Sequence, residues 1–208
     1  SKGNVVNPDH VVEQYGADTL RVYEMFMGPL DASIAWSENG LESTRRFLDR
    51  IWRLYVAEDG SLSERIQDAE NPALERIYHQ TVKKVTEDYE ILHFNTAISQ
   101  MMIFLNATKD QAIIPKAYAQ GLIQLLAPLA PHISEEIWQK LGHQESISHV
   151  AWPSYEEALT IEDQVEVVVQ INGKIKAKVM VEANMAADAL GDLALNLPEI
   201  QAQLEGKT

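Results

Sequence analysis

Cysteine is absent from the 208 residues, which excludes disulfide bonds and disulfide partners, cysteine-ligated zinc, iron–sulfur clusters and thiol catalysis. This absence fits a reducing compartment. Apolar runs are only a handful of residues long, far below the ~20 that cross a bilayer, so no membrane contact is predicted. None of the six histidines belongs to an H-E-x-x-H string or to an i, i+4 pair with a third ligand, so no metal site is predicted.

Basic residues are also scarce. Lys and Arg total 17 against 31 Asp and Glu, which gives a formal net charge of −14. A net acidic protein repels nucleic acid on average, so an RNA-binding role would have to rest on local basic patches. A P-loop, a G-x-G-x-x-G string and a G-x-S-x-G elbow are missing as well. With 46% hydrophobic and 23% charged residues, the chain can nevertheless build a core.

Helix start and stop signals dominate residues 1–159. Asn-Pro pairs at 7–8 and 71–72 match an N-cap followed by a proline in the first turn, and Ser37 opens a long helix with one broad apolar arc. The expected helices span residues 8–15, 18–27, 37–56, about 72–89, about 94–105, 115–127 and 135–141. Four long amphipathic helices with short links predict an antiparallel bundle.

Polar residues near helix starts are expected to act as caps. We expect Asp18 and Ser134 to be the N-caps of their own helices. Glu135 and Glu136 fall in a first turn, where the helix dipole favours carboxylates. His132 is expected to be a buried or capping group rather than a catalytic one.

The pattern changes at about Thr160. Residues 165–171 are rich in β-branched side chains, Asn172-Gly173 is a turn signal, and two short helices follow at about 186–195 and 198–204. The predicted fold class is therefore mainly α, an antiparallel helical bundle followed by a small, truncated α/β domain with a β-hairpin. Its expected parts are a connector at 1–36, the bundle at 37–159 and the partial terminal domain at 160–208.

Burial should select the register of this hairpin. A two-residue turn at Asn172-Gly173 with regular pairing would set Val165, Val167, Val169 and Ile171 among the lysines and leave neither face apolar. We expect instead a three-residue loop with a glycine bulge, which pairs Gln170 with Lys174 and gives one apolar and one basic face. The basic face would carry Lys174, Lys176 and Lys178.

The first eight residues, S-K-G-N-V-V-N-P, resemble the end of the KMSKS signature of class I aminoacyl-tRNA synthetases, with Ser1 at its final serine. Residues 15–21 (Y-G-A-D-T-L-R) and 127–138 (A-P-L-A-P-H-I-S-E-E-I-W) are similar to stretches of the aliphatic-amino-acid group. Residues 27–33 (M-G-P-L-D-A-S) with W-S at 36–37, and V-Q-I-N-G-K at 169–174, resemble leucyl-tRNA synthetases of the bacterial type. The matches cover essentially the whole chain in the family's order.

This resemblance implies the C-terminal part of a leucine–tRNA ligase, which begins at the tail of the KMSKS loop. The nucleotide-binding sheet, the H-I-G-H signature and the editing domain would lie upstream, so Ser1 is the only residue expected to belong to the catalytic site. Lys2 lies beyond the motif and does not inherit the role of its lysine. The intact enzyme would use ATP and Mg to attach leucine to tRNA(Leu), in the cytoplasm and as a monomer. The fragment itself would hold no cofactor and be inactive.

Two groups of basic residues are candidates for tRNA contact. Arg46, Arg50 and Arg53 lie within about 60° of one another on a helical wheel, opposite the apolar arc. Arginine suits the recognition of planar anions, and the alternative for this stripe is a solvated helix face. The second group is Lys174, Lys176 and Lys178. Its alternative is an edge strand that lysines protect from aggregation.

Two other interpretations stay open. One is a sister synthetase for isoleucine, valine or methionine, against which the Asn-Gly-Lys hairpin argues. The other is a helical interaction module without an RNA role, which the charge of −14 favours and the ordered matches along the chain oppose. A Lys-Met-Ser-Lys sequence immediately upstream of Ser1 would support the synthetase.

Overall fold

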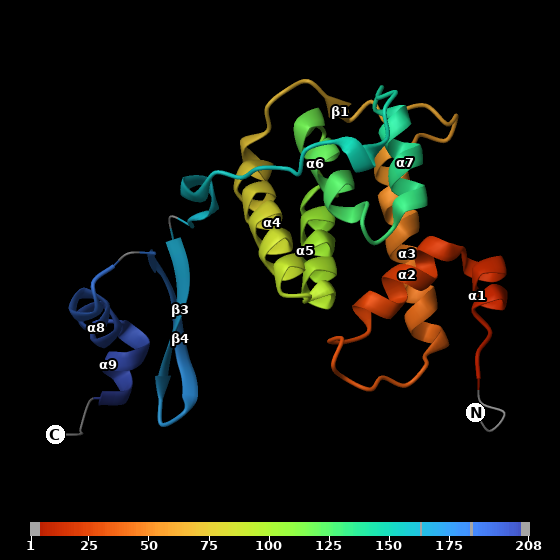
Figure 1. The fold of residues 1–208 in the computed structure, drawn as a ribbon. Coiled ribbons are helices and arrows are strands. Elements are labelled where there is room, and N and C mark those ends of the chain that lie inside the picture. The colour runs from red at the N-terminus through yellow and green to blue at the C-terminus, as the bar shows by residue number, and fades with distance from the viewer. Residues whose placement is uncertain (1–4, 163, 184, 205–208) are drawn as a thin grey trace. The chain divides into compact units, whose positions relative to one another are not determined.

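The computed structural model describes residues 5–162, 164–183 and 185–204. Ser1, the expected end of the KMSKS signature, lies outside the described residues. The chain divides into two compact units, residues 1–159 and 160–208 (Figure 1). The first is built from packed helices, and the second combines a two-stranded antiparallel sheet with two short helices. The predicted mainly α fold with a terminal hairpin is confirmed.

The helices of the first unit, apart from the start of the last one, begin and end close to their predicted positions. Their bounds are α1 Pro8–Tyr15, α2 Ala17–Phe26, α3 Glu38–Tyr55, α4 Pro72–Glu90, α5 Phe94–Ala107, α6 Lys116–Leu126 and α7 Pro131–Lys140. The side chains of Asn7, Ser37 and Asn71 each accept a hydrogen bond from a backbone N–H in the first turn, which explains where α1, α3 and α4 start. The short connecting elements are β1 Ile66–Gln67, β2 Ile114–Pro115, η1 Ile147–His149 and η2 Glu157–Thr160.

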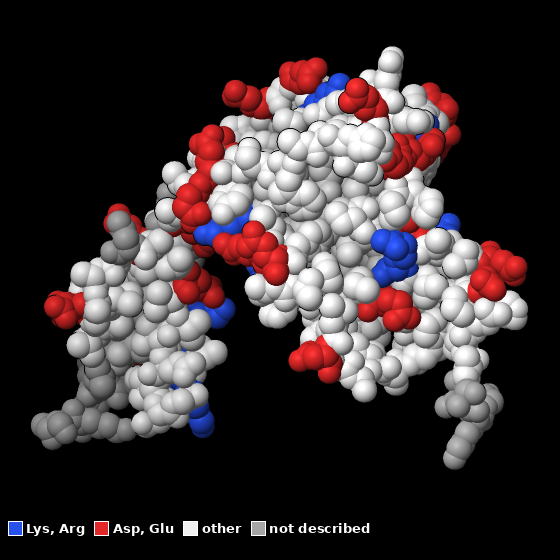
Figure 2. Space-filling view, viewed as in Figure 1, with Lys and Arg blue, Asp and Glu red and all other residues white. Residues whose placement is uncertain are grey.

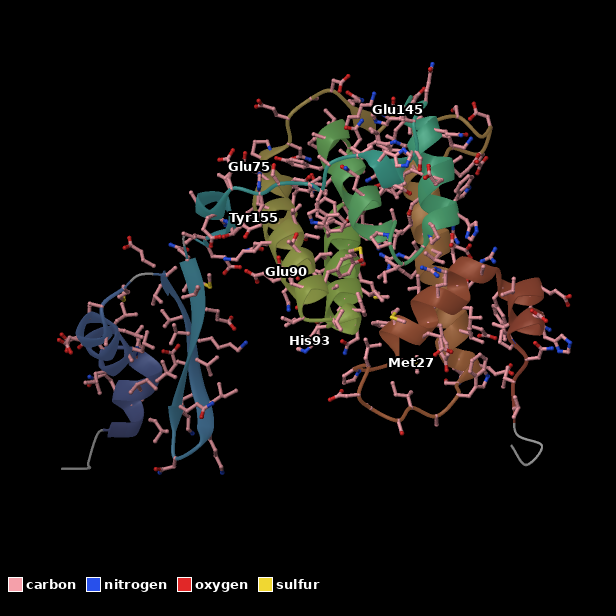
Figure 3. All side chains as sticks on the ribbon, viewed as in Figure 1. Met27, Glu75, Glu90, His93, Glu145 and Tyr155 are labelled. Carbon is pink, nitrogen blue, oxygen red and sulfur yellow. The ribbon has the colours of Figure 1, made fainter. Side chains whose placement is uncertain are left out.

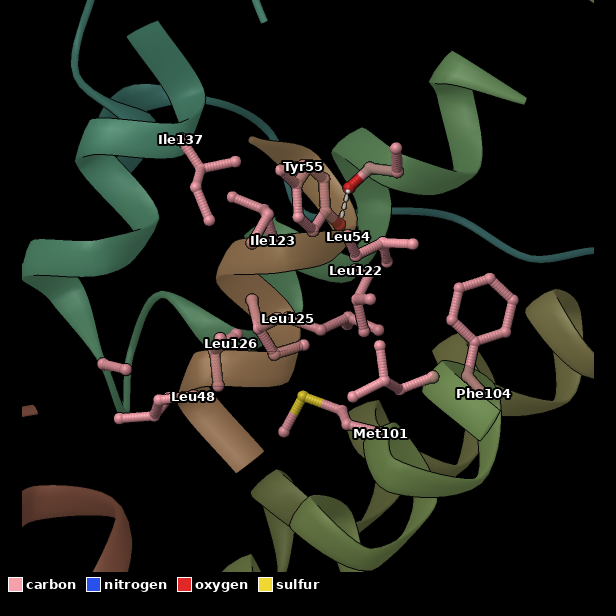
Figure 4. Close-up of a cluster of buried hydrophobic side chains, with 14 of the residues drawn as sticks. Leu48, Leu54, Tyr55, Met101, Phe104, Leu122, Ile123, Leu125, Leu126 and Ile137 are labelled. Atoms are coloured by element: carbon pink, nitrogen blue, oxygen red, sulfur yellow. Dashed lines mark hydrogen bonds between the residues drawn. The ribbon is translucent and has the colours of Figure 1, made fainter. Parts of the chain in front are cut away.

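The core of the first unit lies between α3, α4, α5, α6 and α7. Its largest fully buried side chains include Tyr55, Phe104 and Leu122 (Figure 4). The Tyr55 hydroxyl donates a hydrogen bond of 2.7 Å to the carbonyl oxygen of Ala119, so the polar atom is satisfied inside the apolar cluster (Figure 4). Burial raises the pKa of Tyr55, which keeps this donor protonated.

The predicted start of the last bundle helix is wrong by one turn. α7 begins at Pro131, because proline suits the first helical position, and Ser134 therefore lies inside the helix, buried rather than capping. Glu135 accepts hydrogen bonds from the hydroxyl of Ser146 and, at 3.2 Å, from the backbone N–H of Ile147. It caps η1 rather than its own helix.

The second unit contains β3 Gln164–Ile171, β4 Lys174–Glu182, α8 Ala187–Leu195 and α9 Pro198–Leu204. The turn has two residues, Asn172 with φ 52° and Gly173 with φ 76°, as in a type I′ hairpin. Ile171 pairs with Lys174, so the predicted three-residue loop is wrong. The irregularity occurs one pair further on, where the register shifts between Val169 and Gln170.

This bulge gives the hairpin an apolar face, as predicted, although the bulge lies in β4 and not in the loop. Gln170 pairs with Ile175, but Val169 pairs with Ala177, which leaves Lys176 as the extra residue of β4. Beyond the bulge, Val167 pairs with Val179, so apolar side chains of the two strands share one face of the hairpin. Because a bulge interrupts the alternation of side chains, a regular basic face cannot form along β4.

Candidate nucleic-acid interface

Two of the sequence motifs meet between α2 and α7. Asp18 Oδ2 accepts a hydrogen bond of 2.7 Å from the backbone N–H of Ile133, and Oδ1 accepts one of 3.3 Å from that of His132. The N-cap of α7 is Ala130, which has no side-chain acceptor. The cap is therefore supplied by α2, from a residue 115 positions before Ile133. Asp18 lies within α2, and its predicted role as the cap of that helix is wrong.

The same helix also donates hydrogen bonds to the turn before α7. Arg21 Nε donates to the carbonyl oxygen of Leu129 at 3.0 Å, and its Nη2 donates to that of Pro128 at 2.9 Å. His132 Nδ1 lies 2.8 Å from Asp18 Oδ1 while 74% of the histidine side chain is exposed, so of the two roles expected for His132, buried or capping, burial is wrong. We call the contacts of Asp18 and Arg21 with residues 128–133 the α2–α7 clamp.

A pocket of 510 Å³ lies beside the clamp, lined in part by Asp18, His132 and Arg45. Its charged side chains already have partners. Arg45 Nη1 donates to the carbonyl oxygen of Tyr15 at 2.7 Å, and its Nε donates to Asp49 at 3.0 Å. The charged groups of this pocket are therefore paired with one another or with the backbone.

The three arginines predicted on α3 differ in their partners. Arg46 is exposed, donates to the Ser43 hydroxyl at 2.8 Å and lies 3.8 Å from the Glu42 carboxylate. Arg50 donates to the side-chain oxygen of Asn106 on α5. Within the described part of the chain, the guanidinium of Arg53 has neither an ion pair nor a hydrogen bond. The three arginines of this stripe are thus not equivalent, and Arg46 forms an exposed ion pair within its own helix.

Arg50 and Arg53 line an open pocket of 170 Å³ together with Arg65 and Lys109, two basic residues that lie outside both predicted groups. Leu54, Leu105 and Thr108 complete the lining, which contains no carboxylate. We call Arg50, Arg53, Arg65 and Lys109 the four-cation pocket. Arg65 precedes β1 and Lys109 follows α5, and helical periodicity cannot place such connecting residues beside α3.

Arg65 is held rigidly at the end of α5. Its Nη2 donates to the carbonyl oxygens of Gln111 (2.7 Å), Lys109 (3.2 Å) and Thr108, and its Nε donates to that of Gln111 (2.9 Å). Carbonyls at a helix C-terminus carry partial negative charge, which a guanidinium stabilises. The position of Arg65 in the pocket is therefore set by the backbone.

Outside this pocket, acidic side chains outnumber basic ones on the drawn surface of the first unit (Figure 2), and several of its basic side chains are in ion pairs. Figure 2 shows acidic side chains spread over the drawn face with few basic ones between them. Glu75 and Glu90 lie near opposite ends of α4 (Figure 3). On the same helix, Lys83 pairs with Glu157, and this hydrogen bond raises the pKa of Lys83. The four-cation pocket differs because no carboxylate lines it.

The lysines of the hairpin do not form the predicted basic face. Lys174 lies opposite Ile171, Lys178 lies opposite Val168, and Lys176 is the half-buried extra residue at the bulge. Lys178 Nζ lies 2.8 Å from the Glu166 carboxylate, in an exposed ion pair. The physical reason for the correction is the extra residue, which moves Lys174 to the other face.

Other kinds of site have little support in the structure. Over residues 5–162, 164–183 and 185–204, no group of three or more His, Asp or Glu side chains is placed to hold a metal ion. None of the described helices combines the length and the apolar character that a membrane span requires.

Comparison with known proteins identifies the family. Residues 72–190 match the family described as the anticodon-binding domain of tRNA ligase. The chain is also similar to the crystal structure of the agnB2 LeuRS-tRNA-LeuAMS ternary complex of Agrobacterium radiobacter K84, with 31% sequence identity and a TM-score of 0.76. That match covers 99% of this chain and 29% of the other, so this chain spans less than a third of its length. The resemblance seen in the sequence is confirmed: the fold is that of the C-terminal region of a leucyl-tRNA synthetase, and the chain belongs to the tRNA ligases that carry this anticodon-binding domain.

Proposed function

We propose that the chain is the tRNA-binding part of an enzyme that uses ATP to attach leucine to tRNA(Leu). The observation that carries this proposal is the 31% identity over 99% of the chain to a leucyl-tRNA synthetase solved in a complex with tRNA. Leucine specificity, a cytoplasmic location and a monomeric state are parts of the same proposal. We also propose that ATP and Mg act in the catalytic part of the intact enzyme.

The structure supports a positioning role for this part of the enzyme. Val11, Tyr23 and Leu41 form a small buried cluster that joins α1, α2 and α3. The α2–α7 clamp then fixes α2 to the last helix of the bundle. We propose that tRNA held by the bundle is placed, through these contacts, relative to α1 at the N-terminal end of the described chain. Such a contribution accelerates a reaction by orientation rather than by covalent catalysis.

A purified protein of residues 1–208 should show no leucine-dependent ATP–pyrophosphate exchange. The described residues form helices, a hairpin and one two-residue parallel pairing, which offer no nucleotide-binding sheet. The intact protein should catalyse the exchange with leucine in preference to isoleucine, valine and methionine. Exchange by residues 1–208 above a protein-free control would contradict the assignment. Preference of the intact protein for another amino acid would make it a sister synthetase.

A further inference from the structure

Among the described residues, no carboxylate lines the four-cation pocket or forms an ion pair with its side chains. Arg65 donates to the carbonyl oxygens at the end of α5, and Arg50 donates to the amide oxygen of Asn106. These acceptors carry no negative formal charge, so they do not offset the positive charge of either guanidinium group. Arg53 and Lys109 have no side-chain partner among the described residues. Like charges gathered without a counter-charge repel one another, so an anion bound at this position would be stabilised.

The size of the pocket restricts the kind of anion. Its volume of 170 Å³ is below the about 300 Å³ at which pockets for whole small molecules begin. A phosphate group is small enough for this volume and carries the negative charge that the cations favour. The rest of the molecule to which it belongs can remain outside the pocket. Arg50 is held by its hydrogen bond to Asn106 and Arg65 by its hydrogen bonds to the segment after α5, so both positive charges are in place before the anion arrives. Arg53 and Lys109 have no side-chain partner among the described residues, so their donors remain for the anion, and a guanidinium can donate two parallel hydrogen bonds to phosphate oxygens.

We propose that the four-cation pocket binds one phosphate of the tRNA backbone, with Arg53 and Lys109 as the direct ligands. This inference rests on the proposed function and names the surface through which the bundle holds its RNA. It replaces the stripe predicted on α3, because Arg46 is paired with Glu42 and lies outside the pocket. A phosphate contact of this kind adds affinity and sets the register of the RNA without reading a base.

The test compares two double variants of the intact protein. Arg53→Gln with Lys109→Gln should weaken binding of tRNA(Leu) about tenfold at low salt, and should reduce the slope of log affinity against log salt by about 1. The matched control, Arg46→Gln with Lys83→Gln, removes the same charge from two ion-paired residues of the same unit. It should keep the salt slope of the original protein. Fluorescence titration over a series of salt concentrations measures both quantities.

The outcomes separate this inference from the proposed function. Failure of the intact protein to bind tRNA(Leu) would contradict the proposed function itself. Normal binding with an unchanged slope in the Arg53 and Lys109 variant would overturn only the phosphate site, as would an equal loss in the control. Inorganic phosphate that binds through Arg53 and Lys109, without an effect of the variant on tRNA affinity, would assign the pocket to a free anion and overturn the RNA assignment. A third variant, Arg53→Lys with Lys109→Arg, keeps both positive charges and should have the same slope of log affinity against log salt as the original protein.

Discussion

Replacing Asp18 with alanine is expected to lower the free energy of unfolding of the first unit by about 3 kcal/mol. The carboxylate accepts hydrogen bonds from the backbone N–H groups of Ile133 and His132, and its side chain is only 12% exposed. Without it, two donors at the N-terminus of α7 lose their partner, and the positive end of the helix dipole loses a negative charge. Chemical denaturation followed by circular dichroism measures the loss.

Two further variants and one local measurement make this prediction specific. His132→Ala should cost much less than Asp18→Ala, because it leaves both backbone contacts of Asp18 intact and removes a side chain that is 74% exposed. Asp18→Asn keeps an accepting oxygen without the charge and should be intermediate. Hydrogen exchange of the Ile133 amide should become faster in Asp18→Ala. Equal losses for Asp18→Ala and His132→Ala, with unchanged amide exchange, would show that the cap contributes nothing.

Gly121→Ala should destabilise the first unit by about 2 kcal/mol, although alanine normally favours a helix. A Cβ atom at this position in α6 would meet Tyr78 Oη at 2.1 Å and two carbons of the same ring at 2.8 Å. The ring is buried and stacks on Tyr118, with centroids 4.1 Å apart, so it cannot turn aside without breaking the stack. The overpacking therefore outweighs the gain in helix propensity. Thermal and chemical denaturation measure the result.

The matched control is the same substitution in another helix. A Cβ at Gly191, which is exposed in α8, would meet nothing within 4 Å, so Gly191→Ala should stabilise its own unit by up to about 1 kcal/mol. The tyrosine provides a second measurement. Burial raises the pKa of Tyr78 to about 12, and a ring forced toward solvent by Gly121→Ala should titrate closer to the ordinary value. A stabilising Gly121→Ala with an unchanged Tyr78 pKa would contradict the steric argument.

Local chemistry made most helix boundaries predictable. Asn7, Ser37 and Asn71 act on backbone groups within three residues of themselves, so neighbours in the sequence suffice to identify them. The turn at Asn172-Gly173 also has a local origin, because asparagine and glycine tolerate positive φ, but its length was predicted wrongly as three residues instead of two. The bulge beyond the turn was missed because it depends on how both strands pack, and the expected basic face of three lysines was lost with it.

The sequence by itself therefore determined the mainly α fold, its division near Thr160, and the motifs that mark a leucyl-tRNA synthetase, because each of these is written in residues close along the chain. Tertiary structure alone decided that Asp18 caps a helix 115 residues away, and that Arg65 and Lys109 join Arg53 around one pocket. Hydrogen bonds and charges act over a few ångströms in space, and periodicity along one helix cannot say which distant connecting segment will come within that range.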